Sequence, residues 1–315
     1  MGKIVNRDGD EVRIVVYDNE GNRKKITRIE ELGLSESGEP DLKLILIDCI
    51  GKSLKNLDFY ALFLLSVIII KRLLDKEEFR ERLVLSKRLL GDYEDYAEIT
   101  FKGKKITIPI NTLDMFINHK ILIFHLYIKN QYNVNEKNIK NKVIVDAGAN
   151  IGLFLFMCAV FGPKRIYAFE PIKETYEILK ANIKRNKLES IIIPINKGVG
   201  DRNFSTEINY RMGGDTGASI ELKERYKNPQ KIEVVKLDDF LKDKVINFIK
   251  MDIEGYEENA LRGSKNIIKK YKPILTFSAY HKPTDKVILP EVVRSIRRDY
   301  NIRLYNFADE DFYCE

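Results

Sequence analysis

Cysteine and histidine are scarce in this chain of 315 residues, which contains three of each. Cys49, Cys158 and Cys314 stand far apart and are odd in number, which fits neither a zinc site nor a disulfide framework. Reduced cysteines are typical of intracellular proteins, so we expect a cytoplasmic location. The acidic residues discussed below are not accompanied by a histidine–aspartate pair at ligand spacing, and the sequence therefore predicts no metal site.

Long apolar runs are missing as well. The longest, Phe59–Ile70, has 12 residues, fewer than the ~20 that cross a bilayer, and it fits a buried helix. The first 30 residues are polar and charged, unlike a signal peptide. We therefore expect no transmembrane segment, while contact with a membrane surface stays open because Lys71 and Arg72 follow the run.

Blocks of one charge sign are also missing. The formal net charge is +7, but the lysines are scattered, and the chain has no run of roughly five or more like charges. This pattern favours a solvated surface over a nucleic-acid-binding tail. With 44% hydrophobic and 32% charged residues, the sequence is typical of a soluble globular protein with one full α/β domain and a smaller region.

Residues 1–95 are predicted to form the smaller, α+β accessory region. Alternating apolar and polar residues over Lys3–Ile29 predict a hairpin, and two helices are expected over Leu57–Leu74 and Lys76–Leu90. The first helix is apolar on nearly every side, so it must pack against the main domain, a second subunit or a partner. Formation of an oligomer through these helices stays open.

Residues 96–315 are predicted to form the main domain. From Val143 onward, apolar strands alternate with helices, which is the rhythm of a Rossmann-like parallel sheet with helices on both faces. Two short strands are expected in residues 99–110 and helices over residues 113–132, 151–161, 173–187, 257–270 and 289–298. The residues after Phe307 are expected to form a short tail.

The turn after the first of these strands decides which ligand the sheet can hold. A pyrophosphate-binding turn has the pattern G-x-G-x-x-G, in which bare backbone N–H groups approach the phosphate. Here Asn150 and Leu153 replace the second and third glycines, and Asp146 near the strand's end would repel a phosphate. The sequence therefore argues against an NAD enzyme and favours a ligand with positive charge, such as an ammonium or a sulfonium.

Glu170 ends the next strand, where an acidic residue accepts hydrogen bonds from ribose hydroxyls in dinucleotide-binding folds. Ammonium, sulfonium and ribose diol together describe S-adenosylmethionine, which we predict as the cofactor. The alternative is an ordinary βαβ unit with solvated acids at its strand ends. The predicted cofactor-binding residues are Asp146, Gly148, Asn150, Gly152, Glu170, Pro171, Asn196, Gly198, Val199 and Asp252.

Five successive strands end in polar residues, and the carboxyl edge of a parallel sheet is where a site belongs. These residues are Asp146, Glu170, Asn196, Asp252 with Glu254, and Tyr280 with His281. We therefore expect them to converge on one site.

Four segments resemble motifs of the FkbM-type family of S-adenosylmethionine-dependent methyltransferases. They are Asp146–Gly152, Ala168–Pro171, Leu237–Phe240 and Ile249–Glu257, of which the last is the most specific. The similarity covers roughly residues 97–310. The resemblance implies the seven-stranded class I methyltransferase fold and, for most members, O-methylation of sugars, lipids or other natural products. A small-molecule or glycan acceptor is therefore expected.

Methyl transfer to a hydroxyl is an in-line displacement that depends on alignment of the reacting atoms and benefits from a general base. His281 is the predicted base, because an imidazole titrates near neutrality and the preceding strand lies beside the one that ends at Asp252. Asp252 or Glu254 would orient this histidine, or hold the acceptor or the methionine ammonium. The alternative for His281 is a turn residue before Lys282 and Pro283.

Two other functions stay open. An RNA ribose methyltransferase would share the cofactor site, although neither the charge pattern nor the strand-end residues favour a nucleic-acid groove. A non-catalytic scaffold that binds S-adenosylmethionine would use the amino-terminal helices to capture a partner.

Overall fold

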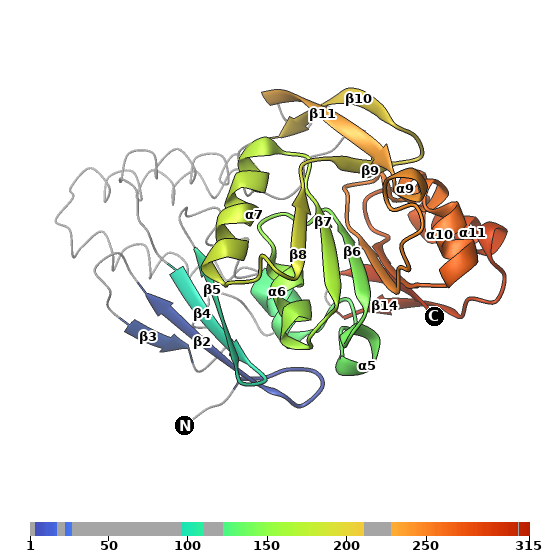
Figure 1. Cartoon of the computed structure of the whole chain (residues 1–315). Helices are drawn as coiled ribbons and strands as arrows, with labels where there is room; N and C mark the ends of the chain where they lie inside the picture. Colours follow the sequence, from blue (N-terminus) through green and yellow to red (C-terminus); the bar gives the residue numbers. More distant parts are fainter. Residues whose placement is uncertain (1–3, 18–22, 27–95, 110–121, 211–227, 308) are drawn as a thin grey trace, which may run out of the picture. The chain divides into compact units, whose positions relative to one another are not determined.

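The computed structural model describes residues 4–17, 23–26, 96–109, 122–210, 228–307 and 309–315 (Figure 1). Contacts divide the chain into two compact units, Met1–Ile128 and Lys129–Glu315. The helices predicted over residues 57–74 and 76–90 lie outside the described residues. None of the described helices combines the length and the apolar character that crossing a membrane requires.

The first unit contains a five-stranded antiparallel sheet. Its strands are β1 (Ile4–Val5), β2 (Glu11–Tyr17), β3 (Arg23–Ile26), β4 (Tyr96–Phe101) and β5 (Lys104–Pro109). The pairing of Tyr17 in β2 with Arg23 in β3 confirms the predicted hairpin. Lys102 and Gly103, with φ of 47° and 76°, form the tight left-handed turn between β4 and β5, as expected for a two-residue hairpin loop.

The boundary between the units differs from the one predicted at residues 95 and 96. β4 pairs with β2 over its whole length, so the segment Tyr96–Pro109 completes the sheet of the first unit. A short π-helix, η2 (Phe124–Ile128), ends this unit and lies within the helix predicted over residues 113–132. The sequence pattern did show these strands, but it could not show which sheet they join.

The second unit is built on a seven-stranded sheet. In spatial order its strands are β14 (Ile302–Asn306), β15 (Glu310–Cys314), β13 (Ile274–Ser278), β12 (Phe248–Met251), β6 (Val143–Ala147), β7 (Arg165–Phe169) and β8 (Ile192–Ile195). All neighbours are parallel except β15, which is antiparallel to β13 and β14. The predicted Rossmann-like, seven-stranded fold class is confirmed.

Helices cover both faces of this sheet. They include α6 (Leu153–Val160), α7 (Lys173–Arg185), α9 (Glu257–Gly263), α10 (Lys265–Tyr271) and α11 (Asp285–Ile296), with shorter α5 (Glu136–Ile139) and α8 (Leu237–Phe240). Successive side chains of β12 point to opposite faces. On one face Phe154 of α6 packs on Phe248, with ring centroids 6.2 Å apart. On the other, Ile249 and Met251 join a core with residues of α9, α10 and α11.

The last residues form a strand and not the predicted tail. β15 lies between β13 and β14, where Phe312 pairs with Phe277 on one side and with Leu304 on the other. Phe312, Tyr313 and Cys314 are buried. The prediction was wrong because this short segment gains its hydrogen bonds and burial from strands elsewhere in the chain, and local pattern carries little of that information.

A separate three-stranded sheet follows β8. β9 (Gly198–Gly200) is parallel to β11 (Asn228–Lys236), and β10 (Phe204–Tyr210) is antiparallel to β11. The glycine-rich stretch between β10 and β11 lies outside the described residues.

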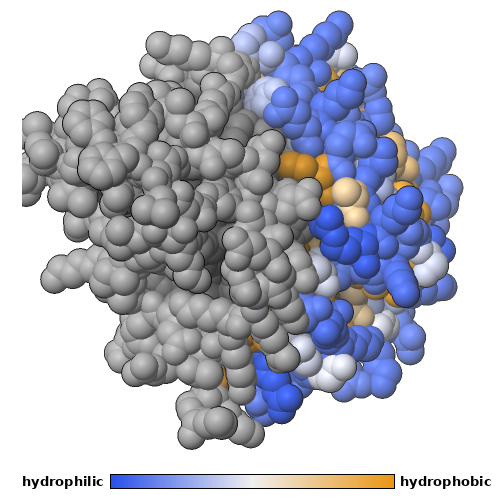
Figure 2. Space-filling model, turned by 90° about the vertical axis from the view of Figure 1, so that its left-hand side faces the viewer, coloured by the Kyte–Doolittle hydropathy of each residue, from blue (hydrophilic) through white to orange (hydrophobic). Residues whose placement is uncertain are grey.

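The described surface in Figure 2 is mainly hydrophilic, and its hydrophobic residues form small separate patches. Large exposed hydrophobic side chains of the described residues are Val5, Phe240, Val245, Tyr280, Val287 and Leu304. Scattered exposed residues of this kind are normal for a globular protein.

Candidate functional site

The sheet of the second unit has a topological switch point at β6. β7 pairs with one edge of β6 and β12 pairs with the other, so successive connections run in opposite directions from this strand. Ligands of open α/β sheets bind outside the carboxyl ends of the strands at such a point. The predicted turn, Gly148–Gly152, leaves β6 here, and Asp252 directly follows β12.

Both glycines of this turn are required by close packing. Gly148 has φ of 81°, and a Cβ there would lie 1.9 Å from the carbonyl oxygen of Asp252. Gly152 has φ of 102°, and a Cβ there would lie 2.8 Å from the ring of Phe156 and 2.9 Å from Leu179. The turn is therefore pressed against the end of β12 on one side and against α6 and α7 on the other.

Glu170 fixes the turn through its carboxylate. Its Oε2 accepts a hydrogen bond of 2.9 Å from the backbone N–H of Asn150, and its Oε1 accepts one of 2.9 Å from Ile172. Burial raises the pKa of Glu170 to about 7, although these two hydrogen bonds oppose the shift. Each oxygen keeps a second lone pair, so the predicted contact with a ribose diol stays compatible with this geometry.

The remaining predicted cofactor residues divide into two groups. The amide Nδ2 of Asn196 donates hydrogen bonds of 2.9 and 3.0 Å to the carbonyl oxygens of Glu170 and Pro171, so these three residues lie together. Gly198 and Val199, in contrast, are buried within β9 and pair with β11. The structure thus brings Asn196 to Glu170 but places Gly198 and Val199 inside a sheet.

Lys250 is a site residue that the sequence reasoning missed. It stands opposite Asp146 in the pairing of β12 with β6, and its Nζ lies 3.1 Å from Asp146 Oδ1. The same Nζ donates a hydrogen bond of 2.8 Å to the carbonyl oxygen of Gly148. The rings of Tyr132 and Phe154 face it, with centroids 5.5 and 5.8 Å away. A lysine within an apolar strand was the available signal, because a buried charge requires a partner.

This ion pair corrects the expectation for Asp146. The carboxylate was expected to face a cationic ligand, but its side chain is completely buried and faces Lys250. Burial raises the pKa of Asp146 to about 6, against the attraction of Lys250. Burial would lower the pKa of Lys250, but Asp146 and Asp252 outweigh it and the pKa is raised. Both groups are therefore charged at neutral pH, and Asp146 supports the turn through its ion pair with Lys250.

Asp252 is held by a second missed residue. The hydroxyl of Tyr132 donates a hydrogen bond of 2.8 Å to Asp252 Oδ2. Burial alone would raise the pKa of Asp252, but the charges of Lys250 and His281 and hydrogen bonds from Tyr132 and Ser278 lower it. Asp252 is therefore a stable carboxylate at the switch point, as the prediction for this residue requires.

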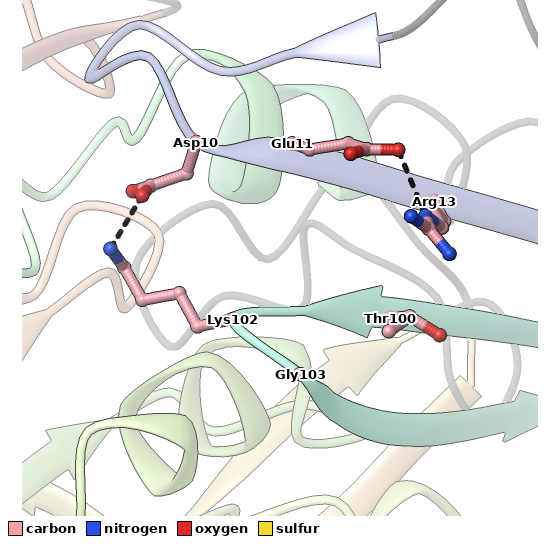
Figure 3. Close-up of a pocket in the computed structure, with 6 residues that line it drawn as sticks. All are labelled: Asp10, Glu11, Arg13, Thr100, Lys102 and Gly103. Atoms are coloured by element: carbon pink, nitrogen blue, oxygen red, sulfur yellow. Dashed lines mark hydrogen bonds and ion pairs between the residues drawn. The ribbon is translucent and has the colours of Figure 1, made fainter.

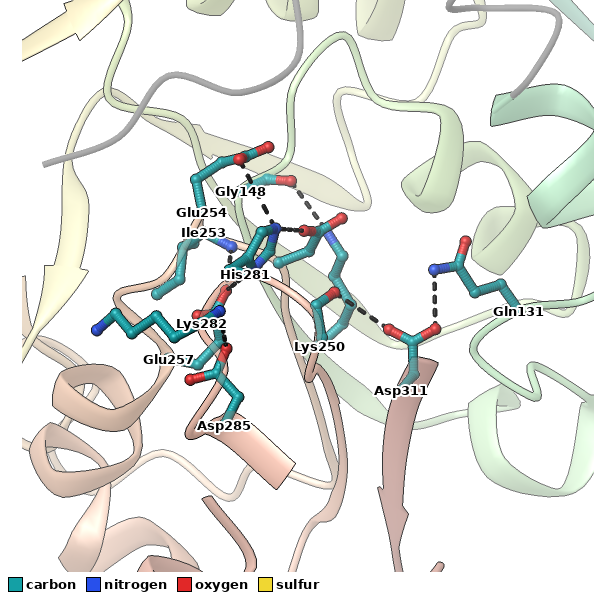
Figure 4. Close-up of polar contacts among 12 residues, drawn as sticks. Gln131, Gly148, Lys250, Ile253, Glu254, Glu257, His281, Lys282, Asp285 and Asp311 are labelled. Atoms are coloured by element: carbon teal, nitrogen blue, oxygen red, sulfur yellow. Dashed lines mark hydrogen bonds and ion pairs between the residues drawn. The ribbon is translucent and has the colours of Figure 1, made fainter. Parts of the chain in front are cut away.

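His281 lies among three carboxylates (Figure 4). Its Nδ1 is 3.2 Å from Glu257, and its Nε2 is 3.7 Å from both Asp252 and Glu254. Burial lowers the pKa of His281, but the three carboxylates outweigh it and raise the pKa to about 9. The prediction of a general base rested on an imidazole that titrates near neutrality, and this premise does not hold here. The predicted convergence of Asp252, Glu254 and His281 does hold.

Asp311 supports the same edge of the sheet. It is buried, and it accepts hydrogen bonds of 2.8 Å from Gln131 Nε2 and 3.1 Å from Ser278 Oγ. Burial raises its pKa from 3.8 to about 7, although the hydrogen bond from Gln131 opposes the shift.

This shift predicts a pH dependence of stability. A carboxyl whose pKa is higher in the folded state than in the unfolded state stabilises the folded state. This stabilisation is fully present below the pKa of the unfolded state and is lost as the pH rises through about 7. Asp311→Asn removes the titration, so its free energy of unfolding relative to the wild type should increase between about pH 4 and pH 8. Urea unfolding at both pH values measures this difference. The control Asp243→Asn changes a carboxyl at an exposed position, and an equal pH dependence in the two variants would contradict the assignment.

A pocket of about 310 Å³ lies on the sheet of the first unit (Figure 3). Its lining residues are Asp10, Glu11, Arg13, Thr100, Lys102 and Gly103. Lys102 pairs with Asp10 at 2.6 Å and Arg13 with Glu11 at 2.8 Å. Because these charges neutralise each other at an exposed surface, this pocket gives no reason to place chemistry in the first unit.

A known domain family covers the switch point. The methyltransferase FkbM domain matches residues 146–304, about half of the 315 residues. Methyltransferase 1 of Beauveria bassiana is 28% identical over 204 residues, which are 58% of this chain and 76% of that protein. Hexuronic acid methyltransferase AglP of Haloferax volcanii is 25% identical over 181 residues, which are 56% of this chain and 71% of that protein.

Among solved structures, a methyltransferase FkbM from Methylobacillus flagellatus is similar with a TM-score of 0.46 and 24% sequence identity. The similarity covers 64% of this chain and 54% of that chain. This chain therefore spans about half the length of that protein.

Proposed function

Because this chain belongs to the FkbM family of methyltransferases, we propose that it transfers the methyl group of S-adenosylmethionine to a hydroxyl group of a sugar, a glycan or another small natural product. Methyltransferase activity follows from the family. The identities of the methyl donor and of the acceptor are what we propose. The residues at the carboxyl ends of β6, β7 and β12 support this proposal.

The single observation that carries the proposal is the interlocked turn after β6. Gly148 touches the backbone of Asp252, and Glu170 holds the N–H of Asn150. This geometry sets the carboxylates of Glu170 and Asp252 on either side of one turn, where Glu170 would bind a ribose. S-adenosylmethionine, when bound, supplies a methyl group on a positively charged sulfur, and a carboxylate-rich edge suits a ligand of that charge.

Within the proposal, Glu170 would accept hydrogen bonds from the ribose hydroxyls, and the turn Gly148–Gly152 would lie along the donor. Asp146 would act indirectly, because its ion pair with Lys250 holds the turn in place. Asp252 and Glu254 would contact the acceptor, since their side chains are 23% and 20% exposed. They would also accept the proton that the hydroxyl releases.

Support for a sugar acceptor comes from the similarity to a protein named as a hexuronic acid methyltransferase. Support for an oxygen nucleophile comes from the site itself, because carboxylates accept hydrogen bonds from hydroxyl groups and orient them for in-line attack. The charged His281 would hold Asp252 and Glu254 in position.

The test is a transfer experiment with radiolabelled methyl groups. The purified full chain is incubated with methyl-labelled S-adenosylmethionine and, separately, with glycan, small-molecule and RNA fractions of a cell extract. The proposal predicts label in the glycan or small-molecule fraction that withstands nuclease treatment. Label confined to RNA would support a ribose methyltransferase instead. Donor binding without transfer to any fraction would support the scaffold alternative.

Glu170→Gln should weaken binding of S-adenosylhomocysteine by at least about tenfold. The glutamine amide replaces one charged acceptor oxygen by a donor, so a bound ribose hydroxyl would lose a hydrogen bond to a charged group, which is worth about 1.5–3 kcal/mol. Isothermal titration calorimetry measures the affinity. The matched control is Glu177→Gln on the exposed side of α7, where the carboxylate pairs with Lys180. Equal affinities of the two variants would show that Glu170 does not contribute to donor binding.

A further inference from the structure

Side chains from three separate segments converge beside the switch point. Asp252 follows β12, Glu257 begins α9 and His281 follows β13. Figure 4 shows Glu257 and His281 close together. One possible ligand atom from each of the three lies within 4.8 Å of the other two. Ligands of one metal ion stand about this far apart or closer, because metal–ligand bonds measure about 2.0–2.6 Å. These residues are far apart along the chain, so their spacing in the sequence does not show a metal site, and the fold brings them together.

Two of these side chains, those of His281 and Glu257, are buried and keep polar atoms for which the described residues supply no hydrogen bond. His281 is 5% exposed and Glu257 is 1% exposed. Among the described residues, neither ring nitrogen of His281 nor Glu257 Oε2 has a partner in hydrogen-bond geometry, although Nδ1 lies 3.2 Å from Glu257 Oε1. The other oxygen, Glu257 Oε1, accepts a hydrogen bond of 2.8 Å from the N–H of Ile253, which fixes the carboxylate towards the histidine. Buried polar atoms are rarely left unsatisfied, and an ion is one explanation when they are.

We propose that Asp252, Glu257 and His281 bind one divalent metal ion. Two carboxylates and an imidazole are a hard, oxygen-rich ligand set that suits Mg²⁺ or Mn²⁺. Glu254 lies 3.7 Å from His281 Nε2 and adds negative charge beside this group. The ion would neutralise the excess negative charge of these carboxylates.

The location of the ion gives it a role that rests on the proposed function. A cation bound to Asp252 would lie where the acceptor hydroxyl is expected. Coordination of the hydroxyl oxygen would lower its pKa and reduce the need for a general base. This accounts for a site in which His281 is surrounded by carboxylates.

The test measures binding of the ion alone, without donor or acceptor, so its outcome does not depend on methyl transfer. The full chain is freed of metal with a chelator and titrated with MnCl₂, while free Mn²⁺ is followed by electron paramagnetic resonance. We expect saturable binding of one ion per chain. Glu257→Gln and His281→Asn should each weaken it by at least about tenfold. The control Glu258→Gln, whose residue pairs with Arg262 on the surface of α9, should bind as the wild type does.

A second readout covers the case in which Glu257→Gln does not fold. The nuclear magnetic resonance signal of His281 is assigned as the one that is missing from the spectrum of His281→Asn. In the wild-type chain, Mn²⁺ should broaden this signal. Absence of saturable Mn²⁺ binding to the wild-type chain would overturn the proposal and leave a histidinium held by its three carboxylates. Equal affinity of Glu257→Gln and Glu258→Gln, or an unchanged His281 signal at saturation, would overturn it as well.

Discussion

Lys250→Met should lower the free energy of unfolding by about 3–5 kcal/mol, because it leaves an uncompensated buried charge. Lys250 and Asp146 are 5% and 0% exposed, and Asp252 is a further negative charge nearby. Methionine keeps the length of the side chain, so the loss reports the charge more than the volume. Urea unfolding followed by circular dichroism measures the change.

Two further variants test this explanation. Lys242→Met, at an exposed position a few residues earlier, should change the free energy of unfolding by less than about 0.5 kcal/mol. The double variant Asp146→Asn/Lys250→Met removes both charges and should be more stable than Lys250→Met alone. If the double variant were less stable than the single variant, the charge pair would not be the reason for the loss.

Gly148→Ala should lower the free energy of unfolding by about 2–5 kcal/mol and weaken binding of S-adenosylhomocysteine at least about tenfold. The substitution has two costs. Alanine is strained at φ of 81°, and its Cβ would lie 1.9 Å from the carbonyl oxygen of Asp252. Because the Cβ is fixed to the backbone and the oxygen is a backbone atom, the end of β12 or the turn must shift, and either shift moves residues of the proposed donor site.

Gly162→Ala is the matched control for this prediction. Gly162 has φ of 71°, but an added Cβ would meet no atom within 4 Å. It therefore carries the conformational cost alone, about 1–2 kcal/mol, and should leave the affinity for S-adenosylhomocysteine unchanged. Similar losses of stability and affinity in the two variants would show that the close approach of the turn to β12 has no effect of its own.

The elements of the second unit could be predicted because their signals are local. Apolar strands alternating with helices gave the parallel sheet, and the two glycines around Asn150 gave the turn. The position of Glu170 at the end of the next strand also depends only on spacing, and the structure places it against the turn. The strand order confirms that Asp252 lies at the switch point.

Other features depend on contacts between distant segments and could not be predicted in this way. The partner of Asp146 stands 104 positions later, at Lys250, and only the register of β12 against β6 pairs them. The environment of His281 comes from the ends of β12 and β13 and the start of α9, and it reverses the charge state expected for an isolated imidazole. β15 became a strand only because β13 and β14 bind its two edges.

Calorimetric titration of the full chain with S-adenosylhomocysteine and, separately, with NADH tests most directly whether this switch point binds an adenosyl sulfur donor. We expect saturable binding of one S-adenosylhomocysteine per chain, weakened at least about tenfold in Gly148→Ala and unchanged in Gly162→Ala, and no binding of NADH. Binding of NADH, or no heat with S-adenosylhomocysteine in the folded wild-type chain, would contradict it.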